Sequence, residues 1–178
     1  MVGENRRILI ILGDNFNADI FHGIKDCLKS AGIAVAIGAV KRDIELIDNK
    51  GNELIRPDIG IDNIPDFNFD AIIVSDGSVH DDLRESKEFQ NLIRYEHDIG
   101  MILGAIGLSV RYFIDAGILE NHSVTGSPDI SYEIEAHGGR YENEPVWVDG
   151  NLITGRMLED LPEFCKTLID EIRLNPAA

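Results

Sequence analysis

The 178-residue chain has little of what would mark a disulfide scaffold or a nucleic-acid-binding protein. It contains only two cysteines, Cys27 and Cys165, whose positions suggest neither a disulfide framework nor a metal site. Basic residues are scarce, since 16 Lys and Arg stand against 32 Asp and Glu, a formal net charge of −16. An acidic surface repels nucleic acid and anionic membranes. We therefore expect no nucleic-acid partner and no membrane partner.

Long apolar runs are also missing. The uncharged stretches 31–40 and 99–110 are shorter than the ~18 residues that a membrane span needs. The apolar run after Arg6 and Arg7 stops at Asp14, which is too short for a signal peptide. These features predict a cytoplasmic protein. The length and the 44% apolar content predict one folded domain over residues 1–178.

Strand patterns alternate with helical patterns along the chain. Residues 8–12 form a continuous apolar run, typical of a strand buried on both faces, and residues 18–31 repeat apolar positions at helical spacing. Cys27 lies on the apolar face of that helix and Cys165 in the last one, so both are expected to be packing residues. The other expected elements are strands at 33–39, 70–74, 101–106 and 124–125, helices at 83–99, 108–116, 129–136 and 160–174, and hairpins within 43–61 and 146–154.

This alternation predicts an α/β fold, a flavodoxin-like three-layer sandwich with a mostly parallel, doubly wound sheet. In such sheets the ligand site lies beyond the carboxyl ends of the strands, where segments 13–18, 75–81 and 106–109 should meet. The segment 75–81 and the residue that follows it contain three acidic residues and a histidine: Asp76, His80, Asp81 and Asp82. Such side chains suit Zn²⁺ or Mn²⁺, but a solvated loop at a helix start is the simpler interpretation. We expect no metal and no cofactor.

Three stretches carry a resemblance to a known family. Residues 100–119, GMILGAIGLSVRYFIDAGIL, resemble the nucleophile-elbow region of the ThiJ/PfpI family, also called the DJ-one family, of the class I glutamine amidotransferase-like superfamily. Residues 139–156, GRYENEPVWVDGNLITGR, are similar to the family's hairpin, and residues 160–164, DLPEF, to the start of its last helix. The resemblance covers residues 7–172. It implies the flavodoxin-like fold and a homodimer or larger homo-oligomer.

The family's catalytic residues are absent from the matching positions. Family members read Ala-Ile-Cys-His-Gly-Pro at the elbow, and the downstream match at residues 116–119 places Gly107 at the cysteine and Leu108 at the histidine. Ala18 stands in place of the family's glutamate, and Ser127 in place of a histidine before Pro128. The resemblance therefore implies a degenerate active site.

A physical reason connects these losses. A thiol at a strand-to-helix turn is activated by the helix N-terminus, and its acid and histidine partners have nothing to act on without the sulfur. The elbow also holds its central residue in a sparsely allowed backbone conformation, which glycine adopts without a side-chain clash. Gly107 is thus interpreted as a position released from catalysis.

Two functions from different classes follow. The first is a non-catalytic protein, that is, a pseudoenzyme. It would bind a small molecule, an anion or a protein partner at the former active-site cleft, or serve as a stress-associated scaffold. The amides of Gly107 and Leu108, joined by an amide near Gly77 or Ser78, would form the anion site. The second is a hydrolase, deglycase or glyoxalase-like enzyme that uses the remaining candidates Ser109, Asp81 and His80. Helix capping is the competing interpretation of Ser109.

Overall fold

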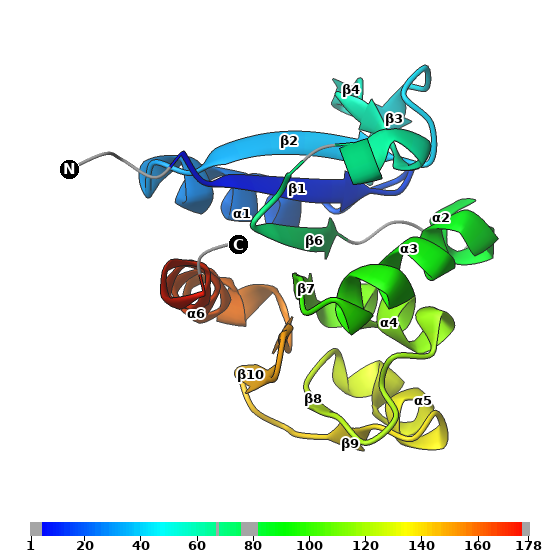
Figure 1. Ribbon diagram of the computed structural model, residues 1–178, viewed down its shortest axis with the longest axis vertical. Helices are drawn as coiled ribbons and strands as arrows, with labels where there is room; N and C mark the ends of the chain where they lie inside the picture. Colours follow the sequence, from blue (N-terminus) through cyan, green and yellow to red (C-terminus); the bar gives the residue numbers. More distant parts are fainter. Residues whose placement is uncertain (1–4, 67, 76–81, 176–178) are drawn as a thin grey trace.

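The computed structural model describes residues 5–66, 68–75 and 82–175, and these form a seven-stranded central sheet (Figure 1). The strand order is β10-β11-β7-β6-β1-β2-β5, and every neighbouring pair is parallel except β10 with β11. The bounds of these strands are β1 Arg7–Leu12, β2 Ala34–Ala39, β5 Ile59–Gly60, β6 Ala71–Ser75, β7 Ile102–Ile106, β10 Val146–Asp149 and β11 Leu152–Gly155. The predicted flavodoxin-like, mostly parallel sheet is confirmed.

The sheet is the middle of three layers. Along β1 the side chains alternate: Ile8, Ile10 and Leu12 belong to the core beneath α1 and α6, whereas Leu9 and Ile11 belong to the core beneath α3 and α4. This alternation follows from the two-residue period of a strand that is buried on both faces. The helices are α1 Ala18–Ser30, α2 Asp82–Glu85, α3 Lys87–Asp98, α4 Arg111–Ala116, α5 Ser131–Ala136 and α6 Leu161–Leu174.

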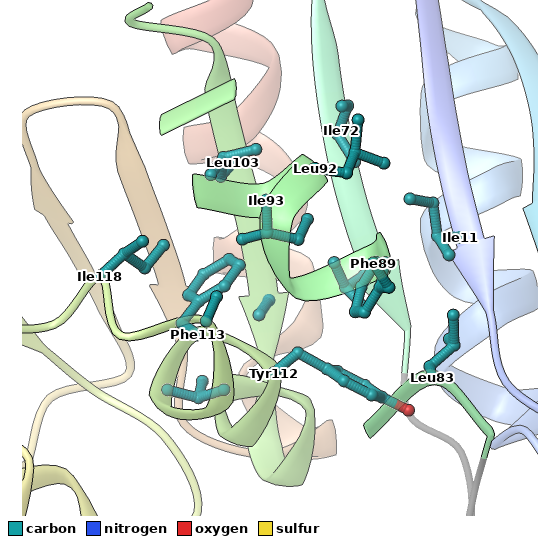
Figure 2. Close-up of a cluster of buried hydrophobic side chains, with 14 of the residues drawn as sticks. Ile11, Ile72, Leu83, Phe89, Leu92, Ile93, Leu103, Tyr112, Phe113 and Ile118 are labelled. Atoms are coloured by element: carbon teal, nitrogen blue, oxygen red, sulfur yellow. The ribbon is translucent and has the colours of Figure 1, made fainter. Parts of the chain in front are cut away.

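Figure 2 shows the core on the α3 and α4 side. Phe89 and Ile93 of α3 and Phe113 of α4 pack over the sheet, and all three are almost completely buried. The rings of Phe89 and Tyr112 meet edge to face, with centroids 5.6 Å apart, which is a favoured aromatic geometry. This core supports α4, the helix that continues from the elbow.

Several predicted elements differ from the structure in detail. The helix expected over 83–99 is broken at Ser86, whose hydroxyl accepts a hydrogen bond from the N–H of Phe89 (3.1 Å) and so begins a new helix. The expected helices at 108–116 and 129–136 both begin with a 3₁₀ turn, η2 Gly107–Val110 and η3 Pro128–Ile130. Two further 3₁₀ segments are η1 Ile61–Asp66 and η4 Leu158–Asp160.

Two small sheets lie outside the central one. The excursion expected within 43–61 contains the antiparallel pair β3 Leu46–Ile47 and β4 Leu54–Ile55, after which the chain returns to the central sheet as β5. The strand expected at 124–125 is β8 Ser123–Val124, which pairs with β9 Arg140–Tyr141. None of the helices in the described ranges has both the length and the apolar composition that a membrane crossing requires.

The outer edge of β2 is only partly covered by a strand, because β5 pairs with Gly38 and Ala39 alone. Beside that pair, the side chain of Asp58 accepts a hydrogen bond from the N–H of Ile37 (2.8 Å). The N–H of Asp58 donates in turn to the carbonyl oxygen of Ile37 (2.8 Å). Both backbone groups of Ile37 are therefore satisfied without a neighbouring strand.

Candidate functional site

The sharp turn that follows β7 is the centre of the candidate site. All five residues of β7 are buried between β6 and β11, and the strand ends at Ile106. Gly107 then adopts φ +66°, in the left-handed region that residues with a side chain rarely enter. Among the described residues, the only atom within 4 Å of a Cβ built on Gly107 is the carbonyl oxygen of Arg156, at 3.9 Å. The described residues thus leave space for a side chain at this left-handed turn, where the glycine supplies none.

Ser109 is held by the end of the strand that precedes it. Its hydroxyl accepts a hydrogen bond from the N–H of Ile106 (2.9 Å) and donates one to the carbonyl oxygen of the same residue (2.6 Å). The side chain is completely buried. Because the hydroxyl proton is already donated to the backbone, this geometry favours the capping interpretation of Ser109 over the nucleophilic one.

The structure brings Ser127 next to Gly107. The N–H of Ser127 donates to the carbonyl oxygen of Gly107 (3.2 Å), and its hydroxyl accepts from the N–H of Asp129 (3.3 Å) at the start of η3. The preceding Gly126 passes so close that a Cβ there would lie 3.4 Å from the Gly107 carbonyl oxygen and 3.3 Å from Val110. The two positions that the resemblance placed in one site are therefore neighbours.

Ala18 and Leu108 contribute apolar surface. Ala18 is the first residue of α1, which begins after Asn17, whose side chain accepts a hydrogen bond from the N–H of Ile20 (3.1 Å). The residue is 9% exposed and belongs to the core beneath α1 and α6. Leu108 is half-buried and packs against the core on the other side of the sheet. Neither side chain can transfer a proton.

The remaining predicted site residues lie outside the described residues. These are Gly77, Ser78, His80 and Asp81, together with Asp76 of the acidic cluster. Their part in the site stays a prediction. Asp82, the last of that cluster, is exposed at the start of α2. Within the described ranges, no group of three or more His, Cys, Asp or Glu side chains could hold a metal ion.

Two arginines near the elbow, Arg156 in space and Arg111 along the chain, are engaged by carboxylates. Arg156, which follows β11, donates from Nε and Nη2 to the two oxygens of Asp160 (3.0 and 3.2 Å), and Asp160 raises the pKa of that guanidinium. Arg111, at the start of α4, donates to both oxygens of Glu133 (3.1 and 2.7 Å), and this pairing lowers the pKa of Glu133. Sequence reasoning missed both pairs. The four-residue spacing of Arg156 and Asp160 was a usable signal, whereas nothing in the sequence links Arg111 to Glu133.

A cavity of about 190 Å³ opens at the carboxyl end of β1, at the same edge of the parallel sheet as the elbow after β7. The residues that line it include three acidic ones, Asp14, Glu45 and Asp82, and the apolar residues Leu12 and Leu83. The Asp14 carboxylate also accepts a hydrogen bond from the N–H of Ile47 (2.9 Å). Sequence reasoning missed Glu45, because it lies in the β3–β4 excursion, far along the chain from the predicted segments. This cavity is therefore lined by acidic residues.

Together, the parallel sheet, the three layers and the left-handed residue after β7 define a class: flavodoxin-like α/β proteins with a strand–elbow–helix site. The model of the DJ-1/PfpI family matches residues 6–171, and the chain belongs to this family. The match spans all three stretches on which the resemblance was based.

A relative and two solved structures are similar to this chain over most of its length. An uncharacterized protein of Archaeoglobus fulgidus is 26% identical over 164 residues, which cover 92% of this chain and 96% of that protein. The crystal structure of a ThiJ/PfpI domain protein from Brachyspira murdochii superposes with a TM-score of 0.86 at 22% identity, over 99% of this chain and 100% of that one. A two-domain protein from Anabaena variabilis, with DJ-1/ThiJ/PfpI-like and ferritin-like domains, gives 0.89 at 22% identity. The match there covers 94% of this chain but only 48% of that one.

Proposed function

We propose that this chain is a cytoplasmic, non-catalytic member of its family that binds a small molecule or a protein partner at the cleft above the elbow. The observation that carries the proposal is Gly107, which keeps the elbow backbone at φ +66° but supplies no nucleophile. Among the described residues, the polar side chains near Gly107 are already engaged in bonds that hold the fold together. The Ser109 hydroxyl binds the backbone of Ile106, and the two nearby arginines pair with carboxylates.

The ligand class that suits the elbow is a small anion, such as a carboxylate. The amides of Gly107 and Leu108 begin a helical segment, and such N–H groups bind anions. The acidic residues Asp14, Glu45 and Asp82 line a cavity at the same edge of the sheet, and their charge opposes an anion. Binding should accordingly be weak and should weaken further as salt is added.

The test compares turnover by the wild type with turnover by Ser109→Ala and by a His80→Ala, Asp81→Ala double variant. We expect methylglyoxal consumption and peptidase or amidase turnover to stay at the buffer rate in all three, because no nucleophile stands at the elbow. A family member with the elbow cysteine provides the positive control. Thermal melts check that Ser109→Ala folds, since removing this buried hydroxyl costs about 1–3 kcal/mol.

Two outcomes would decide against the proposal. Turnover by the wild type that disappears in either variant, with the fold intact, would establish the alternative enzyme built on Ser109, Asp81 and His80. Failure of acetate to shift the amide resonances of Gly107 and Leu108 in an NMR titration at low salt would remove the anion site.

We also propose that the protein is a homodimer at micromolar concentration, as the family resemblance implies. The edge strand β10 adds apolar surface, with Trp147 half-buried and Val148 38% exposed. Light scattering over a dilution series should give twice the mass of the chain throughout the micromolar range. A monomer mass over that range would contradict this prediction.

A further inference from the structure

The helices α1 and α6 touch at a glycine. Both lie on the same face of the sheet (Figure 1). A Cβ built on Gly23 would lie only 2.2 Å from Cδ2 of Leu161, so the first turn of α6 rests directly on the backbone of α1. Each helix follows a strand of the parallel part of the sheet, so the two helices run in the same direction.

This contact places the two cysteines opposite each other. Cys27 lies four residues after Gly23, and Cys165 lies four residues after Leu161. Residues four apart share one face of a helix and are about 6 Å apart along its axis. One turn beyond the contact, the two helices therefore present Cys27 and Cys165 to each other. Sequence reasoning treated them as separate packing residues, because nothing local reveals the close approach at Gly23.

The contacts of the sulfur atoms agree with this register. Sγ of Cys27 lies 3.1 Å from the carbonyl oxygen of Ile24, and Sγ of Cys165 lies 4.0 Å from that of Gly23, so both sulfurs rest on the same turn of α1. The Cys165 thiol beside it lowers the pKa of Cys27, whereas the Cys27 thiol and burial raise the pKa of Cys165. Cys27 is half-buried, whereas Cys165 is only 5% exposed.

We propose that Cys27 and Cys165 form a redox site, a thiol pair that a small-molecule disulfide oxidises to an intramolecular disulfide between α1 and α6. Cys27 is the attacking residue because it is the more accessible of the two and ionises first. Cys165 is the resolving residue, buried beside it. In a cytoplasmic protein such a bond is transient and regulatory rather than a permanent staple.

The reaction balances in two exchanges. The Cys27 thiolate attacks one sulfur of the reagent RSSR, forming Cys27–S–SR and releasing RS⁻. Cys165 then loses its proton to solvent and attacks Cys27 Sγ, forming the Cys27–Cys165 disulfide and releasing a second RS⁻. Two thiols of the protein are oxidised, and the reagent is reduced to two thiols.

The test exposes the folded protein to excess oxidised glutathione and follows it by intact mass, peptide mapping and non-reducing gel electrophoresis. The wild type should lose the mass of two hydrogens, yield a peptide pair joined through Cys27 and Cys165, and stay free of intermolecular crosslinks. Dithiothreitol should restore the original mass. The melting temperature should rise on oxidation and return on reduction, since a crosslink restricts the unfolded chain.

Single variants separate the two roles. Cys165→Ser should stop at the glutathione adduct of Cys27, because no resolving thiol remains. Cys27→Ser should react roughly tenfold more slowly than the wild type, because Cys165 is buried and its thiol resists ionisation. A wild type that keeps a stable glutathione adduct on Cys27 beside a free Cys165, that crosslinks between molecules, or that does not react would overturn the proposal.

Discussion

Phe164→Ala should lower the free energy of unfolding by about 3–5 kcal/mol, the usual cost of removing a buried aromatic ring from a core. Phe164 lies in α6 and is completely buried. Its ring packs over two glycines of neighbouring strands: Cβ atoms built there would lie 3.4 Å from the ring at Gly104 and 3.0 Å from it at Gly155. Since these glycines have no side chains that could move into the space, the truncation should leave a cavity that collapses poorly. Urea denaturation followed by circular dichroism measures the change.

The matched control is Leu158→Ala in η4, close to α6 along the chain. Leu158 is 40% exposed, so its truncation should change the unfolding free energy by no more than about 0.5 kcal/mol. The strands under Phe164 are β7 and β11, which lead directly to Gly107 and Arg156. A loss below about 1 kcal/mol in Phe164→Ala would show that the sheet repacks and that the elbow does not depend on this ring.

Gly107→Cys should fold, lose about 1–2 kcal/mol of stability, and carry a thiol whose pKa lies below the ordinary value of about 8.5. The stability cost comes from a side chain at φ +66° and not from a clash, because the nearest described atom is 3.9 Å from the new Cβ. The pKa falls because the new thiol stands at the start of a helical segment, where the backbone dipoles favour an anion. The pH profile of alkylation, measured in a Cys27→Ser, Cys165→Ser background, reports this pKa.

Gly117→Cys is the matched control for this variant. Gly117 has φ +70°, no described atom within 4 Å of its built Cβ, and a position at the other end of the same helical segment. Its backbone penalty should equal that of Gly107→Cys, while its thiol pKa should lie above 8.5, because carbonyl dipoles surround it. Equal thiol pKa values in the two variants would show that the elbow no longer stabilises an anion. Gly107→Cys should still lack turnover, since Ala18 stands where the resemblance places the acid.

The parts of this molecule that the sequence predicts well depend on local patterns. The run 101–106 predicted β7 because a strand buried on both faces must be apolar throughout, and Gly107 followed from the elbow motif directly after it. That Gly107 and Ser127 lie next to each other was predicted only through the family resemblance. Its physical basis is a long-range backbone hydrogen bond, which the periodicity of apolar residues does not predict.

The parts that escaped sequence reasoning depend on side-chain size and charge across the fold. The meeting of Cys27 and Cys165 requires the absence of a side chain at Gly23, which lets the two helices approach. The break at Ser86 arises because a serine hydroxyl competes for a backbone N–H within a stretch whose apolar spacing still looks helical. Neither effect can be read from hydrophobic spacing.

The double hydrogen bond between Asp58 and Ile37 has a consequence for crowded solutions of this protein. An uncovered strand edge is a template on which a strand from another molecule can add, and this is a common start of aggregation. On β2 that position is already occupied by an aspartate from the protein's own chain. An approaching strand would have to displace both hydrogen bonds, and the Asp58 carboxylate would lie in its path. Asp58 thus opposes the addition of a strand at Ile37, where β5 does not reach.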